Sequence, residues 1–329
     1  MKAAVLEGLK KLVVKEVEEP RCENDQVKIK VHKAAICNFS DLEVYEGTSP
    51  VMEALGYPHI FGHENSGEIV EVGKNIEGFS IGDRIAFYYK GTGAFAEYNI
   101  LTPSKLAIAK LDENVSYDEG AILEIAGGGA MRNVYGSGIK LGDNILTMGV
   151  RPAGLFAGMC AKLSGAKSWI ALDLYDFRLH KALELGATAV FNILKMSQKE
   201  IIDAIHEQVG EIDIVFETMG EDRSPDKSGL DFAVNIVKFG GNIRLFTYSG
   251  ERYKFFPGEV QTKGVNLVGR KPSLERTRKL INLAQKWVAE DRYPIKRLIT
   301  HHIGLDDIEE ALKLIKEKSD KVLKVVVDI

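Results

Sequence analysis

Hydrophobic and polar positions alternate in short runs over residues 1–117, and Gly and Pro interrupt these runs. The clearest runs are residues 26–36, 66–73, 83–89 and 94–100. A period of two residues is typical of strands with one buried face. The pattern therefore predicts a β-rich domain in this part of the chain.

The pattern changes after residue 144, where short apolar runs alternate with amphipathic segments. Strands are expected at 144–148, 168–172, 188–191, 212–217, 242–246 and 265–269, and helices between them at 152–166, 177–187, 197–210 and 229–240. Strands that alternate with helices are joined by crossovers and run in parallel, with helices on both faces. The fold class predicted is α/β, with a doubly wound parallel sheet of the Rossmann type.

Two further stretches complete the predicted organisation. Residues 116–139 indicate a linking helix, although three consecutive glycines within it weaken that prediction. The tail predicts a helix at 273–292, strands at 296–303 and 321–329, and between them a helix opened by Asp306, with Glu309 at capping-box spacing. We expect one domain over 1–117, completed by 290–329, and a dinucleotide-binding domain over 118–289.

Composition narrows the class of protein. A chain of 329 residues has room for two domains, and 45% hydrophobic and 27% charged residues with a net charge of -4 are ordinary for a globular protein. We expect no nucleic-acid partner, and no membrane association because no apolar stretch reaches about 18 residues. The N-terminus lacks the apolar core of a signal peptide, so a cytoplasmic location is expected.

The turn after the first predicted parallel strand has the character of a phosphate-binding loop. It runs from Gly149 through Arg151 and Pro152 to Gly154 and opens a helix. In a dinucleotide site the first glycine makes the turn, the second admits the pyrophosphate and the third allows close packing. Arg151 occupies the second position, where it either pairs with a phosphate or weakens cofactor binding.

An acidic residue at the end of the next strand supports a dinucleotide site. Asp173 lies 19 residues after Gly154, close to the spacing of about 20 residues for a ribose-binding carboxylate. A carboxylate there favours NAD over NADP because it would repel a 2′-phosphate. The nearby cations Arg178 and Arg151 leave NADP open.

Four segments, GHENSGEIVEVG, GDRIAF, GAFAEY and KRLITHHIGLDDIEEALKLI, occur in an order that resembles the zinc-type alcohol and polyol dehydrogenases of the medium-chain dehydrogenase/reductase family. The resemblance covers nearly the whole chain. It implies a GroES-like fold for the β-rich catalytic domain, an NAD(P)-dependent oxidoreductase acting on a small alcohol or carbonyl compound, and a homo-oligomer, either a dimer or a tetramer.

The same resemblance implies a catalytic zinc site. Cys37 and His63 match zinc ligands, and Glu124, 25 positions before Gly149, matches the third. Glu64 matches a residue beside the metal that can replace a ligand. No cysteine occurs between about 80 and 115, so we expect no structural zinc held by cysteines there.

The loop after Cys37 is one residue longer than the family pattern. If the loop absorbs this residue, Ser40 matches the hydroxyl that relays the substrate proton, and Asp41 matches the acid that orients a ligating histidine. If it does not, the site is distorted or free of metal. The resemblance leaves both outcomes open.

These features predict hydride transfer between a secondary alcohol and NAD(P), with zinc as a Lewis acid. A carboxylate as third ligand favours a polyol, sugar or amino alcohol. One alternative is a zinc-independent quinone or enoyl reductase of the same fold, although the pair His63–Glu64 argues against it. The other is a degenerate binding protein without turnover, which Arg151 and the longer loop after Cys37 suggest.

Overall fold

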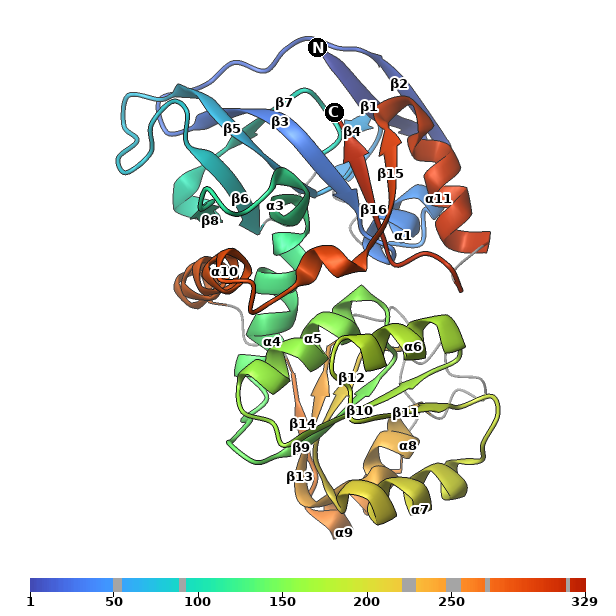
Figure 1. The fold of residues 1–329 in the computed structure, drawn as a ribbon. Coiled ribbons are helices and arrows are strands. Elements are labelled where there is room, and N and C mark those ends of the chain that lie inside the picture. Colours follow the sequence, from blue (N-terminus) through green and yellow to red (C-terminus); the bar gives the residue numbers. More distant parts are fainter. Residues whose placement is uncertain (50–54, 89–92, 221–228, 247–255, 270–272, 318–319) are drawn as a thin grey trace. The chain divides into compact units, whose positions relative to one another are not determined.

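The chain forms two compact units in a computed structural model that describes all residues except 50–54, 89–92, 221–228, 247–255, 270–272 and 318–319. The first unit combines Met1–Gly128 with Ser273–Ile329, and the second is Gly129–Pro272. The ribbon in Figure 1 shows the elements of each unit along the chain. The second unit begins later and ends earlier than the dinucleotide-binding domain expected from the sequence.

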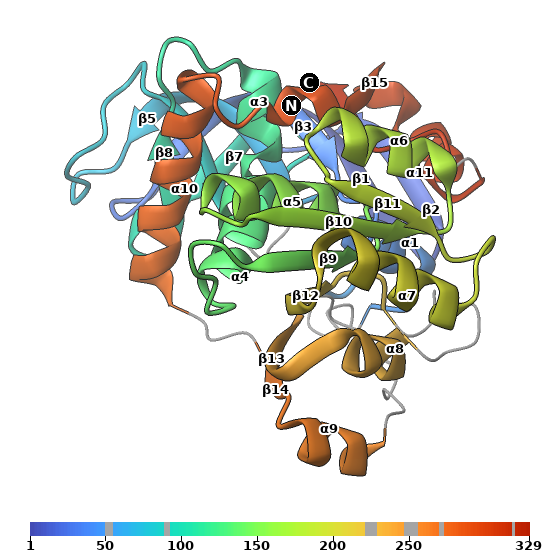
Figure 2. The same ribbon diagram turned by 60° about the horizontal axis from the view of Figure 1, so that its bottom comes forward.

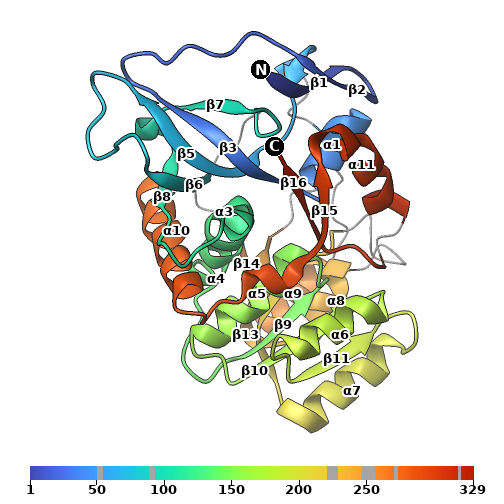
Figure 3. The same cartoon turned by 45° about the horizontal axis from the view of Figure 1, so that its top comes forward.

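The first unit is built on β-sheets. Within the described residues, seven strands form one sheet in the order β15-β16-β3-β5-β6-β8, with β7 also paired to β3. Their bounds are β3(Val27–Ile36), β5(Glu64–Val72), β6(Arg84–Tyr88), β7(Tyr98–Leu101), β8(Ala107–Lys110), β15(Ile299–Gly304) and β16(Lys324–Asp328). A smaller sheet has the order β2(Lys11–Glu16), β1(Lys2–Gly8), β4(His59–Ile60). The predicted β-rich domain is confirmed, with the tail strand β16 beside β3 (Figure 3).

Helices α1(Ser40–Glu46), α3(Tyr117–Leu123), α10(Leu274–Ala289) and α11(Ile308–Glu317) belong to this unit. Hydrogen bonds attach α10 to this unit. Arg278 donates to the carbonyls of Pro103 and Leu106, and Asn282 donates to the carbonyl of Ile108 in β8. The sequence-based boundary at residue 289 assigned α10 to the other domain. Amphipathic periodicity identifies a helix but does not tell which sheet it covers.

The predicted helix through the three glycines is present. Helix α3 continues as a π-helical turn, η2(Glu124–Met131), and then as α4(Arg132–Tyr135). A Cβ atom on Gly128 would lie 2.1 Å from Cδ2 of Tyr88, so close packing requires a glycine here. The glycines that weaken helix propensity are thus compensated by tertiary contact.

The capping box expected at Asp306 differs in the structure. A 3₁₀ turn, η5(Leu305–Asp307), precedes α11, which begins at Ile308. The Asp306 carboxylate accepts a hydrogen bond from Lys2 Nζ at 2.6 Å, and Glu309 accepts one from the Tyr45 hydroxyl at 2.8 Å. Both acidic side chains form tertiary contacts, which the local sequence could not indicate.

The second unit contains the predicted parallel sheet. In the described part of the chain its six strands are ordered β11-β10-β9-β12-β13-β14 and all pair in parallel (Figure 2). Their bounds are β9(Asn144–Met148), β10(Ser168–Asp173), β11(Ala189–Asn192), β12(Ile212–Glu217), β13(Val237–Leu245) and β14(Asn266–Val268). The sheet is a doubly wound Rossmann arrangement, as predicted.

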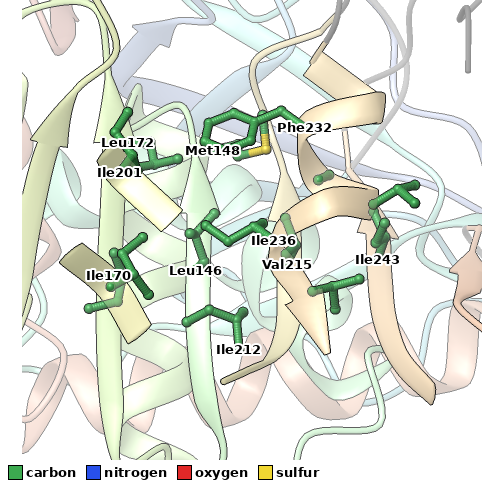
Figure 4. Packing of buried hydrophobic residues seen from close by; sticks show 14 of the residues in the cluster. Leu146, Met148, Ile170, Leu172, Ile201, Ile212, Val215, Phe232, Ile236 and Ile243 are labelled. Atoms are coloured by element: carbon green, nitrogen blue, oxygen red, sulfur yellow. The ribbon is translucent and has the colours of Figure 1, made fainter. Parts of the chain in front are cut away.

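Helices cover both faces of this sheet. Figure 1 shows α5(Pro152–Leu163) and α6(Asp176–Glu184) on one face and α7(Gln198–Val209) and α8(Gly229–Ile236) on the other; α9(Pro257–Lys263) precedes β14. The core beneath α7 and α8 includes Leu146, Ile170, Ile201, Val215 and Ile236 (Figure 4). This two-sided burial explains why the central strands are nearly continuous apolar runs.

No helix among the described residues combines the length and apolar character that a membrane crossing requires.

Candidate metal and cofactor sites

Residues 37–39 join β3 to α1, and Ser40 and Asp41 are the first two residues of that helix. The Cys37 amide donates to Asp41 Oδ2 at 2.8 Å, and the Ser40 hydroxyl donates to Cys37 Sγ at 3.0 Å. The Asn38 side chain is held by the C-terminal segment, since its Nδ2 donates to the Leu323 carbonyl at 2.6 Å. Both Ser40 and Asp41 thus lie beside Cys37.

His63 precedes β5 and lies against the same loop. Its Nδ1 is 2.9 Å from Asp41 Oδ1, and its Nε2 is 3.3 Å from Ser40 Oγ. Burial alone would lower the pKa of His63, but the charge and hydrogen bond of Asp41, together with Cys37, outweigh burial and hold that pKa well above 6.5. The surroundings of this imidazole therefore favour positive charge.

Glu64 completes a group of ligand-type atoms. Cys37, His63 and Glu64 offer atoms that all lie within 4.8 Å of one another, the one such group of three among the described residues. The carboxylate of Glu64 is fully buried and accepts two hydrogen bonds from Lys324 Nζ, at 2.7 and 2.5 Å. Glu64 is thus close to the expected metal position but already neutralised by a cation.

Lys324 is a site residue that sequence reasoning did not identify. It is 1% exposed, and its Nζ also donates to the Ile36 carbonyl at 2.9 Å. Burial lowers the pKa of Lys324, but the charge and hydrogen bonds of Glu64, together with the nearby Cys37 and Asp41, outweigh burial, and the pKa is raised. A signal was available: Lys324 interrupts the apolar run of the last strand, where a buried charge requires a partner.

Glu124 ends α3 and begins the π-helical turn, with 7% of its surface exposed. It is not part of the group formed by Cys37, His63 and Glu64. The π-helical winding that starts at this residue is of a kind often found at functional sites.

The donor chemistry fits a zinc ion. A thiol, an imidazole and a carboxylate are preferred zinc donors. Asp41 fixes the imidazole through Nδ1 and directs Nε2 toward Cys37 and Ser40, which is how a carboxylate orients a ligating histidine. The acidic surroundings that raise the pKa of His63 also favour a cation at this point.

In the second unit, the turn between β9 and α5 has the geometry of a dinucleotide loop. Gly149 has φ +87°, and a Cβ on Gly154 would lie 2.0 Å from the Gly149 carbonyl oxygen. Pro152 occupies the first turn of α5, and Arg151 is its N-cap. The first and third glycines serve the steric roles that the sequence assigned to them.

A pocket of about 190 Å³ lies at the carboxyl ends of β9, β10 and β12; its lining residues are Gly149, Arg151, Asp173, Leu174, Tyr175, Arg178, Thr218 and Met219. Parallel sheets bind ligands at this position, where the strand order reverses. Four of the six residues expected to bind the cofactor line this one pocket.

Asp173 is held firmly in this pocket. Its Oδ2 accepts from the Val150 amide at 2.8 Å, and its Oδ1 accepts from the amides of Leu174 and Tyr175 at 2.8 and 3.1 Å. Arg178 Nη1 lies 3.5 Å from Oδ1. The expected ribose-binding carboxylate is thus rigid and partly compensated by Arg178.

Comparison with known proteins identifies the family. Residues 23–112 match the model of the alcohol dehydrogenase GroES-like domain, and residues 152–286 match the model of the zinc-binding dehydrogenase. Sorbitol dehydrogenase 1 of Saccharomyces cerevisiae is 29% identical and aligns over 99% of this chain and 97% of its own. The chain belongs to the zinc-type alcohol and polyol dehydrogenases of the medium-chain dehydrogenase/reductase family, and it is an oxidoreductase.

A further relative and a solved structure agree with this family. The (R,R)-butanediol dehydrogenase of Bacillus subtilis is 29% identical over 97% of each chain. The crystal structure of 2R,3R-butanediol dehydrogenase from Bacillus subtilis superposes with a TM-score of 0.85, at 27% identity, over 100% of this chain and 99% of that one. The GroES-like and Rossmann folds are confirmed, the family implies zinc and a nicotinamide cofactor, and neither alternative function is favoured.

Proposed function

We propose that this enzyme transfers a hydride between a polyol, sugar or amino alcohol and NAD, with one catalytic zinc. The observation that carries the proposal is the arrangement of Cys37, Ser40, Asp41 and His63, in which a thiol, a hydroxyl and an oriented imidazole converge. The relatives named for sorbitol and butanediol support a secondary alcohol as the substrate.

Cys37 and His63 would hold the zinc, with Glu124 as third ligand and Glu64 as the alternative ligand. Both oxygens of Glu64 are engaged by Lys324, which weakens Glu64 as a permanent ligand. Glu64 becomes available if Lys324 yields one of its oxygens. Three protein ligands leave a fourth position open, as catalytic zinc requires.

When bound, zinc supplies Lewis acidity to the alcohol oxygen and the nicotinamide accepts the hydride. Asp41 accepts a hydrogen bond from the Nδ1–H of His63 and so fixes its tautomer. The lone pair of Nε2 is then available to bind the metal. Ser40 Oγ, 3.0 Å from Cys37 Sγ and 3.3 Å from His63 Nε2, is placed to take a proton from a substrate hydroxyl and pass it outward.

Asp173 supports NAD as the cofactor because its carboxylate at the end of β10 would repel a 2′-phosphate. The proposal includes no structural zinc and a homo-oligomeric assembly, a dimer or a tetramer, in line with the resemblance to the family.

Metal analysis combined with a substrate panel tests this function. Purified protein should contain about one zinc per chain and oxidise at least one polyol, sugar or amino alcohol with NAD. Cys37→Ser and His63→Ala should lose zinc and turnover together, whereas Cys22→Ser should lose neither. Full turnover in a zinc-free Cys37→Ser protein would refute the proposal. Glu124→Gln and Glu64→Gln, compared for zinc content, identify the third ligand.

A further inference from the structure

Asn38 lies in the turn between Cys37 and Ser40, the residues proposed to hold the metal and to relay the proton. Its side chain is buried, with 9% of the residue exposed, and its Nδ2 donates to the Leu323 carbonyl at 2.6 Å. A carbonyl oxygen can only accept, so the amide nitrogen must face Leu323, and this fixes the orientation of the carboxamide. The other end of the carboxamide, Oδ1, is consequently an acceptor directed elsewhere.

Oδ1 of Asn38 is enclosed by protein but accepts no hydrogen bond from any of the described residues. A buried acceptor without a donor is costly, and buried polar atoms generally obtain a partner from protein, ordered water or a ligand. The turn around it is held in place, because the Cys37 amide donates to Asp41 and the Ser40 hydroxyl donates to Cys37 Sγ. The free acceptor thus belongs to a fixed turn at the proposed reaction centre, where a ligand can supply the donor.

A second buried asparagine shows what is particular about Asn38. Asn65 is 1% exposed, its Nδ2 donates to the Ala94 carbonyl at 3.4 Å, and its Oδ1 likewise has no partner in the part of the chain that the structure describes. Asn65 follows Glu64 in β5, and successive side chains of a strand point to opposite faces of the sheet. Its carboxamide therefore faces away from the side on which Glu64 meets Cys37.

The ligand group that suits Asn38 Oδ1 is a neutral hydroxyl. Both acids of this cluster already have partners, since Glu64 is paired with Lys324 and Asp41 with His63. An ammonium group would meet an acceptor without a full negative charge, at a site that is also proposed to hold a divalent cation. A hydroxyl needs only the acceptor.

We propose that Asn38 Oδ1 accepts a hydrogen bond from a second hydroxyl of the substrate, on the carbon next to the one that is oxidised. Asn38 is then a specificity-determining residue that selects vicinal diols and polyols over simple alcohols and amino alcohols. This inference rests on the proposed function and narrows its substrate class. A buried acceptor that the substrate pairs discriminates against an analogue without the hydroxyl, because the analogue leaves that acceptor unpaired.

Three probes with one carbon skeleton test the proposal: 2,3-butanediol, 2-butanol and 3-amino-2-butanol. Calorimetric titration of the zinc-loaded protein with NADH present gives dissociation constants without turnover, and steady-state kinetics with NAD gives kcat/KM. The best polyol of the substrate panel and its analogue without the adjacent hydroxyl are measured in the same way. The wild type should favour the diol over both other probes.

Asn38→Ala should weaken the diol about five- to a hundredfold, the range for a buried group that loses its hydrogen-bond partner. It should change 2-butanol little, so the preference for the diol should narrow. Asn38→Ser keeps a hydroxyl that can donate to Leu323 but lacks the carboxamide oxygen, and it provides the same test if Asn38→Ala does not fold. Melting temperature and zinc content of each variant are measured on the same samples.

Asn65→Ala is the matched control, because it removes a buried carboxamide that also has one unpaired oxygen but lies on the opposite face of β5. It should leave the ratio of the diol affinity to the 2-butanol affinity unchanged, even if it lowers stability. A change in this ratio as large as that of Asn38→Ala would show that the effect is not specific to the turn after Cys37.

Equal losses for the diol and 2-butanol in Asn38→Ala would mean that the residue only shapes the turn, and would overturn the inference. A wild type that binds the two probes equally would do the same, as would a larger loss for the amino alcohol than for the diol. A wild-type protein that oxidises no alcohol of the panel with NAD would instead refute the proposed function, and this inference with it.

Discussion

Lys324 Nζ lies 2.7 and 2.5 Å from the two carboxylate oxygens of Glu64, and both residues are almost completely buried. A buried charge that loses its partner is strongly destabilising, whereas replacing both charges is often tolerated. The pair therefore links the stability of the first unit to the residues around the proposed metal.

Lys324→Met is expected to reduce the free energy of unfolding by about 3–5 kcal/mol, because it leaves the Glu64 carboxylate buried without a partner. Urea denaturation of chelator-treated protein measures this loss without a contribution from zinc. The double variant Lys324→Met/Glu64→Gln should recover a large part of it. Lys321→Met, at an exposed position of the same segment, should have little effect. An equal loss in the single and the double variant would contradict the assigned coupling.

Asp41→Asn is expected to lower zinc affinity about 10- to 100-fold, since the carboxylate that orients His63 is lost. Competition with a chromophoric chelator measures the affinity. Asp306→Asn removes an acid whose side chain is 67% exposed in the same unit and should leave zinc binding unchanged. Zinc affinity that is unaltered by Asp41→Asn would contradict the role of Asp41 in orienting His63 as a zinc ligand.

Ser40→Ala should reduce turnover by about 10²-fold while zinc content stays at the wild-type level, because positioned proton transfer contributes rate and not metal binding. Ser40→Thr keeps a hydroxyl and should retain most of the activity. Steady-state kinetics on the best substrate of the panel, with metal analysis of the same samples, distinguishes the two effects. Loss of zinc from Ser40→Ala would show a structural role for this hydroxyl instead.

Tyr45→Phe is expected to lower stability near neutral pH by about 1 kcal/mol, since the hydrogen bond to Glu309 is lost. Burial and then Glu309 raise the pKa of Tyr45 from 10.0 to about 12. Between these values the unfolded chain has released the phenolic proton and the folded chain still holds it, so the stability contributed by Tyr45 falls as pH rises through this window.

The stability deficit of Tyr45→Phe should accordingly shrink above about pH 10. Guanidinium denaturation at a series of pH values from about 8 to 11 measures it, with Tyr135→Phe, at an exposed tyrosine, as the control. A deficit that stays constant across the series would contradict the raised pKa.

The fold of the second unit was predictable because each of its strands is marked by a local pattern of apolar residues. Leu146 and Val215 belong to strands that are covered by helices on both faces of the parallel sheet. Such strands need apolar side chains on both sides, and this requirement produces an apolar run that is visible in the sequence. The glycine turn and Asp173 were likewise recognisable from spacing within one strand–helix–strand segment. Boundaries were less predictable, since α10 is assigned to its unit by hydrogen bonds to residues 172 to 175 positions away.

The candidate metal site was predictable only in part. Cys37 and His63 came from a motif, but the register of the lengthened loop depends on Asn38 donating to Leu323, 285 residues away. The partner of Glu64 is equally remote in the sequence. Contacts between residues so far apart in the sequence leave no local pattern. The spacing of residues therefore could not predict the hydrogen bond from Asn38 to Leu323 or the Glu64–Lys324 pair.

The place of β16 beside β3 has a consequence for biosynthesis. Glu64 and the lysine that neutralises it are made 260 residues apart, and the carbonyl that anchors Asn38 belongs to the neighbouring Leu323. While residue 324 is still inside the ribosome, the emerging β-rich segment carries an uncompensated carboxylate and an unanchored loop. The Glu64–Lys324 pair and the anchor of Asn38 can therefore form only after the last strand of the polypeptide has been synthesised.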